Sequence, residues 1–254
     1  MRPLLYAVAC AVFAQPPELE IRIIYDNTSA RAELKEDWGF AALATFGGRR
    51  ILFDSGTKPD LFLENLGKLG IAPGSIEQAL ISHEHGDHRN GIYRLYPLHR
   101  ALSVHFLDRF LPEAFTEAER IGLRPNRVTG PFQLADGVFS SGLVEGDPPE
   151  QALAIETSKG IAMLVGCSHP GVVKMVETVL ARRRASSIRL LVGGMHMFRQ
   201  TAEQIRPQIE RLRALRVERI APAHCTGDLA RQMFREAYGA AFEEAGAGRL
   251  LTMP

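Results

Sequence analysis

The chain has 254 residues, of which 46% are hydrophobic and 23% are charged, as is ordinary for a globular protein. Lys and Arg number 30 against 29 Asp and Glu, so the charge balance gives no case for binding nucleic acid or an anionic membrane surface. The length allows one large domain or two small ones with a substantial core.

The first 14 residues differ from the rest of the chain. Arg2 supplies a positive charge, and residues 4–14 form an apolar run of signal-peptide length that is too short to span a bilayer. We predict a signal peptide over residues 1–14, and therefore a periplasmic or secreted protein. The alternatives are an apolar terminus or a first strand of the fold, with a cytoplasmic protein if the segment is retained.

From residue 18 onward the chain has no linker, low-complexity tract or repeat, and we predict one domain over residues 18–254. Short β-rich runs dominate its first part, and Gly47-Gly48 is typical of a hairpin turn between two of them. A helix is expected over residues 59–69, with Gly70 ending it. The strands predicted for this part cover residues 21–25, 40–46, 51–53 and 78–81.

The second half of the chain alternates predicted strands with helices, whose apolar residues recur at helical spacing. Alternation of this kind implies a layered α/β architecture, while the early hairpins argue against a purely parallel sheet. We therefore predict an α/β (α+β) fold in which two mixed sheets pack face to face with helices outside. The strands predicted for this part cover residues 161–165, 188–192 and 217–221.

Six of the eight histidines follow predicted strands, in loops that contain glycine or proline. A single histidine is most often an ordinary core or surface residue, and we interpret His99 and His105 in that way. Chance explains the other six poorly, because ligands of layered α/β folds gather at strand ends. These six are His83, His85, His88, His169, His196 and His224.

The strongest pattern is the run His83-x-His85-x-Asp87-His88. Alternate residues of an extended segment point the same way, so His83 and His85 can bind one ion. The turn that follows brings Asp87 and His88 to a second position nearby. Imidazole and carboxylate groups suit Zn²⁺, Fe and Mn²⁺ in hydrolytic sites, whereas a structural zinc site favours a compact Cys₄ or Cys₂His₂ pattern that this sequence lacks.

This run resembles the signature of the metallo-β-lactamase-fold superfamily, and Ile51–Gly56 resembles its upstream Asp-Gly motif. Further motifs between residues 25 and 227 resemble a branch labelled as dihydropterin-linked aminobenzene ribofuranosyl phosphate synthase. The resemblance implies an αββα sandwich with metal ions at one edge. The motifs of the branch are Tyr25-Asp26-Asn27, Trp38-Gly39-Phe40, Gly166-Cys167-Ser168-His169-Pro170-Gly171, Gly193-Gly194-Met195-His196 and His224-Cys225-Thr226-Gly227.

Carried over residue by residue, the resemblance implies two Zn²⁺ ions, with Fe or Mn as alternatives. Asp54 would orient a ligand by hydrogen bonds without touching metal, although a strand-ending turn explains this residue equally well. The implied ligands are His83, His85 and His169 for one ion, and Asp87, His88 and His224 for the other.

The sequence departs from the wider superfamily pattern at the bridge between the two ions. Most members have a further histidine loop and then a Gly-Asp bridge, but this chain has no histidine between His105 and His169. Cys167 follows a strand and a glycine where the bridging Asp is expected. It is a candidate metal ligand, because thiolates bind Zn²⁺. The alternatives are a buried thiol or a disulfide to Cys225, and the number of ions stays open.

Three more residues are candidates for contacts with a substrate. His196 is expected to contact the substrate or an oxyanion, or to donate a proton to the leaving group, ahead of a role as metal ligand. Thr226 precedes a helix predicted to start near Asp228, where it would help bind an anionic group or simply act as N-cap. Trp38 could line an apolar wall with Phe40, or both could pack in the core.

The leading hypothesis is a metal-dependent hydrolase in which a metal-bound hydroxide attacks a phosphoester or another ester-like centre of a small molecule. Asp87 and His196 are the predicted catalytic side chains. The alternatives are a pterin or ribosyl-phosphate transferase-type synthase, a metal-dependent oxidoreductase, and a metal-binding sensor without turnover. Export would separate the protein from a cytosolic pterin intermediate, which argues against the synthase alternative. The sequence leaves the substrate and the oligomeric state open.

Overall fold

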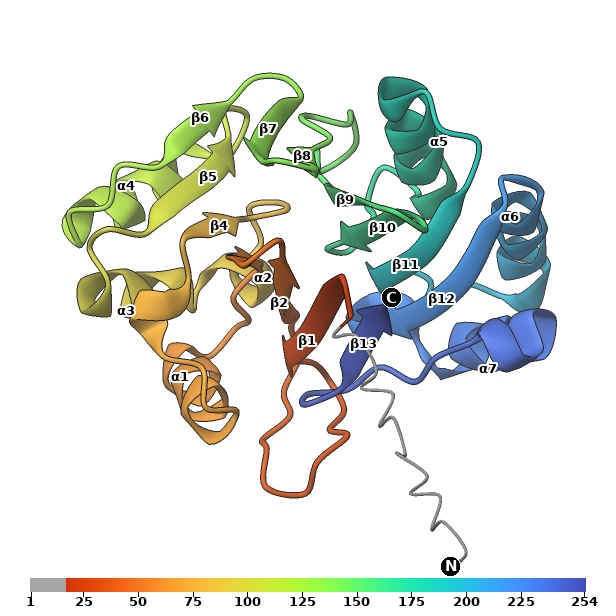
Figure 1. Ribbon diagram of the computed structural model, residues 1–254, viewed down its shortest axis with the longest axis horizontal. Coiled ribbons are helices and arrows are strands. Elements are labelled where there is room, and N and C mark those ends of the chain that lie inside the picture. The colour runs from red at the N-terminus through yellow and green to blue at the C-terminus, as the bar shows by residue number, and fades with distance from the viewer. Residues whose placement is uncertain (1–16) are drawn as a thin grey trace, which may run out of the picture.

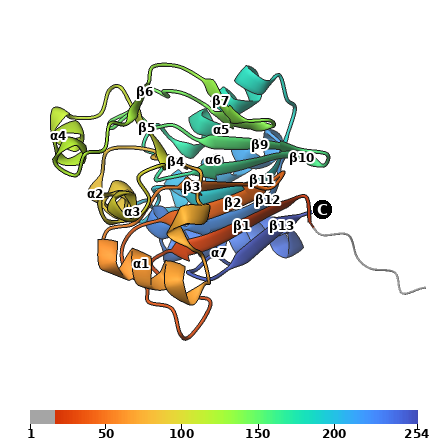
Figure 2. The same ribbon diagram turned by 60° about the vertical axis from the view of Figure 1, so that its left-hand side comes forward.

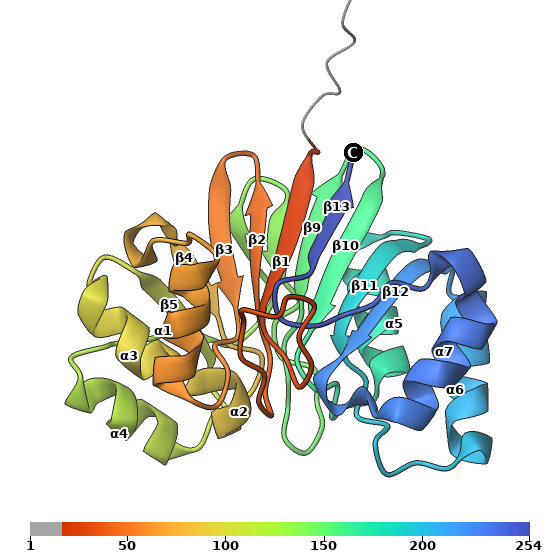
Figure 3. The ribbon, with the colours of Figure 1, turned by 90° about the horizontal axis from the view of Figure 1, so that it is seen from below.

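The computed structural model describes residues 17–254, so the predicted signal peptide over residues 1–14 lies outside the described residues. The described chain forms two β-sheets that pack face to face, with helices on both outer faces (Figures 1 and 3). This arrangement confirms the predicted fold class, an αββα sandwich of two mixed sheets. Among the described residues, no helix combines the length and apolar character needed to cross a membrane.

The first sheet has seven strands in the order β13-β1-β2-β3-β4-β5-β6. The strands from β13 to β3 pair antiparallel, and those from β3 to β6 pair parallel. The predicted hairpin turn is confirmed, because Gly47 and Gly48 connect β2 to β3 at positive φ angles of 56° and 78°. The strands are β1 (Leu19–Tyr25), β2 (Ala41–Phe46), β3 (Arg49–Phe53), β4 (Gln78–Leu80), β5 (Ser103–Leu107), β6 (Asn126–Val128) and β13 (Leu250–Met253).

The second sheet has six strands in the order β12-β11-β10-β9-β8-β7. Here β10, β11 and β12 pair parallel, and the remaining neighbours pair antiparallel. Both sheets therefore contain a parallel group whose strands all end at one edge. The strands are β7 (Phe132–Ala135), β8 (Val138–Ser140), β9 (Leu153–Thr157), β10 (Gly160–Val165), β11 (Ile188–Gly194) and β12 (Val217–Ala223).

The helices divide between the two outer faces, and Figure 2 brings those of the first sheet toward the viewer. The helix predicted over residues 59–69 is α1, and its apolar face packs against the sheet through Phe62 and Leu66. The helices beside the first sheet are α1 (Pro59–Lys68), α2 (Gly86–Arg89), α3 (Ile92–Leu98) and α4 (Pro112–Arg120). Those beside the second sheet are α5 (Val172–Arg183), α6 (Ala202–Ala214) and α7 (Asp228–Tyr238).

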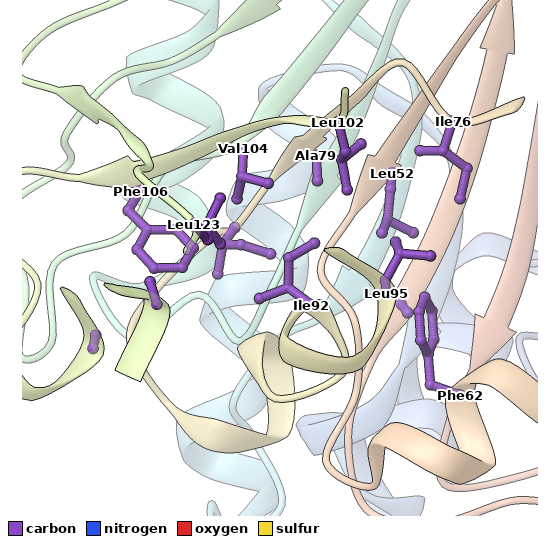
Figure 4. Packing of buried hydrophobic residues seen from close by; sticks show 14 of the residues in the cluster. Leu52, Phe62, Ile76, Ala79, Ile92, Leu95, Leu102, Val104, Phe106 and Leu123 are labelled. Carbon is purple, nitrogen blue, oxygen red and sulfur yellow. The ribbon is translucent and has the colours of Figure 1, made fainter. Parts of the chain in front are cut away.

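Buried side chains fill three layers, one between the sheets and one under each set of helices. In β1, Ile23 faces the layer between the sheets while Ile24 faces the helices, as the alternation of a strand dictates. Figure 4 shows part of the layer of the first sheet, which extends from Phe62, near Leu95, to Phe106, near Leu123. Full burial of each such side chain stabilises the fold by about 1.5–3 kcal/mol, which holds the strand ends rigidly in place.

His105 lies in β5 away from the other histidine loops and makes the stability of the fold depend on pH. Its Nε2 lies 3.0 Å from Gln78 Oε1, its ring packs on Phe132, and burial lowers its pKa to about 4. The unfolded chain binds a proton here between pH 6.5 and 4 while the folded chain does not, so stability falls as pH drops through this window.

Between pH 7 and pH 5 the free energy of unfolding should fall in both proteins. We expect the fall to be about 2 kcal/mol larger for the wild-type protein than for His105→Gln. Urea unfolding at the two pH values measures this difference. His99→Gln, at a half-buried position outside β5, should keep the wild-type pH dependence. Equal pH dependence of wild-type protein and His105→Gln would contradict the burial argument.

Candidate metal centre

The loops that follow five strands meet at one edge of the sandwich. In the first sheet, Asp54 follows β3 and His83 follows β4. In the second sheet, Cys167, His196 and His224 follow β10, β11 and β12. The carboxyl ends of neighbouring parallel strands lie at the same edge, so the topology alone gathers these side chains from distant parts of the chain.

The six histidines of the strand-end loops form one continuous cluster. The ring of His83 lies 4.1 Å from that of His88 and 4.7 Å from that of His169, measured between centroids. The ring of His88 lies 4.9 Å from that of His224, and the ring of His169 lies 4.3 Å from that of His196. His85 completes the cluster at 4.8 Å from both His83 and His169.

Four of these histidines have their Nδ1 atoms fixed by a neighbouring polar side chain. A metal-ligating histidine commonly donates its second ring N–H in this way, which sets the tautomer and turns the other nitrogen toward the ion. The pairs are His83 with Ser82 Oγ (2.8 Å), His88 with Asp54 Oδ2 (2.7 Å), His224 with Asn27 Oδ1 (2.9 Å) and His169 with Glu150 Oε1.

Several ring nitrogens in the cluster are buried without a hydrogen-bond partner among the described residues. They are Nε2 of His83, Nε2 of His224 and Nδ1 of His196. Leaving a buried polar nitrogen unpaired costs about 1–3 kcal/mol, so their gathering in one place needs an explanation. A cation bound by these lone pairs supplies it, and the donor set of imidazole, carboxylate and thiol suits Zn²⁺.

Two ligand groups suitable for metal ions share the thiol of Cys167. His83 and His169 form one with it, His88 and His224 form the other, and within each group the candidate ligand atoms lie within 4.8 Å of one another. Asp87, which lies in α2 beside the first sheet, is close to the second group, with its Oδ2 atom 3.3 Å from His224 Nε2. The two sets implied by the sequence resemblance are thus brought together, with Cys167 between them.

Both cysteines of the described chain are free thiols, so the structure contains no disulfide between Cys167 and Cys225. The Sγ atom of Cys167 instead lies 3.2 Å from His88 Nε2. This contact places the thiol beside one of the predicted metal ligands.

Two histidines of the buried cluster have pKa values shifted in opposite directions. Burial lowers the pKa of His83 well below its ordinary value. Burial acts in the same direction on His88, but the carboxylate of Asp54 outweighs it and raises the pKa of His88 to about 9. A cation that binds at His88 Nε2 therefore releases a proton, so its affinity increases with pH.

The backbone of the strand-end loops is strained. Among the described residues, six that are not glycine have positive φ angles, and four of these lie beside the histidine cluster. Each such conformation costs about 1–3 kcal/mol and is typical of functional sites. The four residues are Asp54 (59°), Ser168 (64°), His196 (50°) and His224 (46°).

A family model described as the metallo-beta-lactamase superfamily matches residues 39–224. The chain belongs to this superfamily. A curated relative from Methanocaldococcus jannaschii, 7,8-dihydropterin-6-methyl-4-(beta-D-ribofuranosyl)-aminobenzene-5'-phosphate synthase, is 28% identical over 250 residues. That match covers 80% of this chain and 84% of the relative.

Solved structures show the same superfamily fold. A metal-dependent hydrolase of the beta-lactamase superfamily superposes with a TM-score of 0.75 at 24% identity, covering 92% of this chain and 99% of that one. The metallo-beta-lactamase fold protein YhfI from Bacillus subtilis has a TM-score of 0.68 at 12% identity, with the same coverage. At these identities the likeness establishes the fold alone.

One residue of this metallo-β-lactamase fold was missed by the sequence analysis. Glu150 is fully buried, and its carboxylate accepts hydrogen bonds from the backbone N–H groups of Ser168 and His169, each at 2.9 Å, as well as from His169 Nδ1. It thereby fixes both the loop after β10 and the ring of His169. The only sequence signal is an acidic residue in a Pro-rich loop, which is common at surfaces.

Trp38 lies at the mouth of the cluster and not in the core, where Phe40 packs. The indole of Trp38 is 45% exposed, contacts the rings of His224 and Phe198, and donates from Nε1 to Asp87 Oδ2 at 2.8 Å. Gly39 lets the backbone next to Trp38 lie close to that of Asp87, because a Cβ at residue 39 would lie 2.6 Å from the Asp87 carbonyl oxygen. Core packing, the interpretation favoured for both residues over an apolar wall, is wrong for Trp38 and confirmed for Phe40.

The predictions for Thr226 need correction. The N-cap of α7 is Gly227, and no side chain caps this helix. Thr226 is fully buried, and its hydroxyl donates to the Ala223 carbonyl at 2.7 Å while accepting from the Met195 N–H at 3.2 Å. Both hydroxyl contacts are internal, so Thr226 fixes the loop after β11 instead of facing a substrate.

Proposed function

We propose that this chain is a metal-dependent hydrolase of a small molecule that carries a phosphoester or another ester-like group. The observation that carries the proposal is the shared orientation of four histidines. Each has its Nδ1 atom held by a polar neighbour, and the rings meet around the thiol of Cys167. Pre-oriented imidazoles of this kind support a centre built to hold cations.

His83, His85 and His169 would hold one ion, and Asp87, His88 and His224 the other, with Cys167 between them. Zn²⁺ fits this donor set, with Fe and Mn as alternatives. When bound, the ions would polarise the scissile ester and supply an activated water at neutral pH.

The chain's own residues supply orientation and proton transfer. Asp54 and Glu150 hold the rings of His88 and His169, so these ligands need no reorganisation during the reaction. The half-buried His196 lies between His169 and Phe198, and in our proposal it would donate a proton to the leaving group. The exposed indole of Trp38 forms one wall of the entrance.

Trp38→Phe separates the two roles of the tryptophan, because phenylalanine keeps an aromatic wall but cannot donate to Asp87. We expect kcat for a nitrophenyl phosphodiester to fall about tenfold, with KM nearly unchanged. A tenfold loss is the lower limit of the usual effect of removing a hydrogen bond that supports a metal ligand. Steady-state kinetics with metal analysis measure this split. A raised KM with kcat intact would show that Trp38 only binds substrate.

A second candidate function is the synthase activity named for the curated relative, favoured by the 80% of this chain that aligns with it. Purified, zinc-loaded protein should be offered a phosphodiester, a phosphomonoester and a carboxylic ester, and separately the substrates of the synthase. Our proposal expects turnover of at least one ester and no synthase product. Synthase product without ester turnover would favour the second candidate.

We also propose that the protein is exported after removal of residues 1–14. Mass spectrometry of the mature N-terminus from cells tests this proposal. An N-terminus near Gln15 is the expected result, and an intact Met1 would contradict it.

A further inference from the structure

Two sulfur atoms and one ring nitrogen meet beside the histidine groups. Cys167, His196 and Cys225 place their candidate ligand atoms within 4.8 Å of one another. The three residues follow β10, β11 and β12, which are neighbours in the parallel part of the second sheet. Both thiols are buried, with exposed fractions of 3% and 1%.

The proposed hydrolytic mechanism gives Cys225 no role. Within the described structure, its Sγ atom makes a weak contact of 3.6 Å with the Cys167 carbonyl oxygen. Nδ1 of His196 is buried and lacks a hydrogen-bond partner among the described residues. A small apolar residue would fill the position of Cys225 equally well, so packing alone does not account for a thiol there.

The backbone is shaped so that this thiol can approach Cys167. A Cβ at Gly194 would lie 2.7 Å from Cys225 Sγ and 2.5 Å from the Gly166 carbonyl oxygen. Only glycine therefore lets the loops after β10 and β12 come so close. His196, two residues further on, has a strained φ of 50°, and its Nδ1 atom is buried.

Two thiolates and an imidazole are a ligand set for a thiophilic divalent ion. With Zn–S bonds of about 2.3 Å and Zn–N bonds of about 2.0 Å, tetrahedral geometry separates the ligand atoms by roughly 3.5–3.8 Å. Atoms that already lie within 4.8 Å reach this spacing by small side-chain rotations. The histidine groups are harder, because nitrogen and oxygen dominate them.

We propose that Cys167, His196 and Cys225 form a third metal position, softer in ligand character than the two histidine positions, which binds a thiophilic divalent cation. Cys167 belongs to this group and to both histidine groups described above, so its sulfur connects the third position to the other two. The proposal goes beyond the hydrolytic function, because it requires no turnover.

Titration of reduced, metal-free protein with Cd²⁺ tests the third position. We expect wild-type protein to retain three Cd²⁺ ions after gel filtration, together with ultraviolet absorption from thiolate-to-cadmium charge transfer. Cys225→Ser and Cys225→Ala should each retain two ions and about half of that absorption. Met197→Leu, a buried change of similar volume in the same region, should behave as wild type, and circular dichroism checks folding of every variant.

Two retained ions in wild-type protein would overturn the proposal, as would unchanged counts in the Cys225 variants. Fewer than two ions in folded Cys225 variants would also overturn it, because Cys225 would then support the histidine positions. The hydrolase proposal fails separately: zinc-loaded wild-type protein without ester turnover contradicts that function whatever the cadmium count.

Discussion

Replacement of His85 by alanine is expected to reduce hydrolysis of bis(4-nitrophenyl) phosphate by more than about a hundredfold. Loss of a residue that supports a metal ligand typically lowers metal affinity or activity by about 10–100-fold, and loss of the ligand itself should lower activity further. His85 is exposed at the mouth of the cluster, and its ring contacts His83 and His169. Removing it should change the unfolding free energy by no more than about 0.5 kcal/mol.

The comparison requires kcat/KM on protein whose metal content has been measured. His99→Ala serves as the matched control, since His99 is a half-buried histidine at the end of α3 outside the cluster. This control should retain full activity. Wild-type activity in metal-verified His85→Ala protein would exclude His85 from the reaction and contradict the assignment of the first ion position.

Glu150→Gln should lower zinc affinity by about 10–100-fold. The carboxylate accepts from two backbone N–H groups and one ring N–H, whereas an amide presents N–H groups of its own to these donors. Glutamine keeps one oxygen acceptor, so either the Ser168 N–H or the two donors of His169 lose their partner, and the orientation of the His169 ring is weakened. Because buried donors lose their acceptor, the free energy of unfolding of the metal-free variant should also be about 1–3 kcal/mol lower than that of metal-free wild-type protein.

Competition with a chromophoric chelator measures the zinc affinity, and urea unfolding measures the stability. Glu156→Gln is the control, because this glutamate pairs with Arg183 at the surface, away from the cluster. It should leave zinc affinity unchanged. Wild-type affinity in Glu150→Gln would show that His169 does not need its buried partner.

Elements with a strong local pattern could be predicted from the sequence. The Gly47-Gly48 turn lies between two β-rich runs, and α1 has an apolar face and ends at Lys68, two residues before Gly70. Both depend on interactions between residues close in the chain. The histidine run was visible for a related reason, because its ligand-type residues recur within six positions of the chain, from His83 to His88.

The supporting residues depend on contacts between distant segments and leave no local pattern. Glu150 meets His169 only because the loop before β9 lies over the end of β10. Asn27 and His224 are 197 residues apart, and the closing of the second sheet onto the first brings them together. Thr226 looked like an N-cap because Asp228 begins α7, but Gly227 turns the chain at a φ of 79° between them.

The most direct test of the central claim measures phosphodiester hydrolysis by purified protein as isolated, after removal of metal with a chelator, and after addition of Zn²⁺. We predict turnover that is lost with the metal and restored by Zn²⁺, in parallel with the zinc content. Turnover that survives complete metal removal, or its absence in protein shown to contain zinc, would contradict a hydrolytic metal centre built on the histidine cluster.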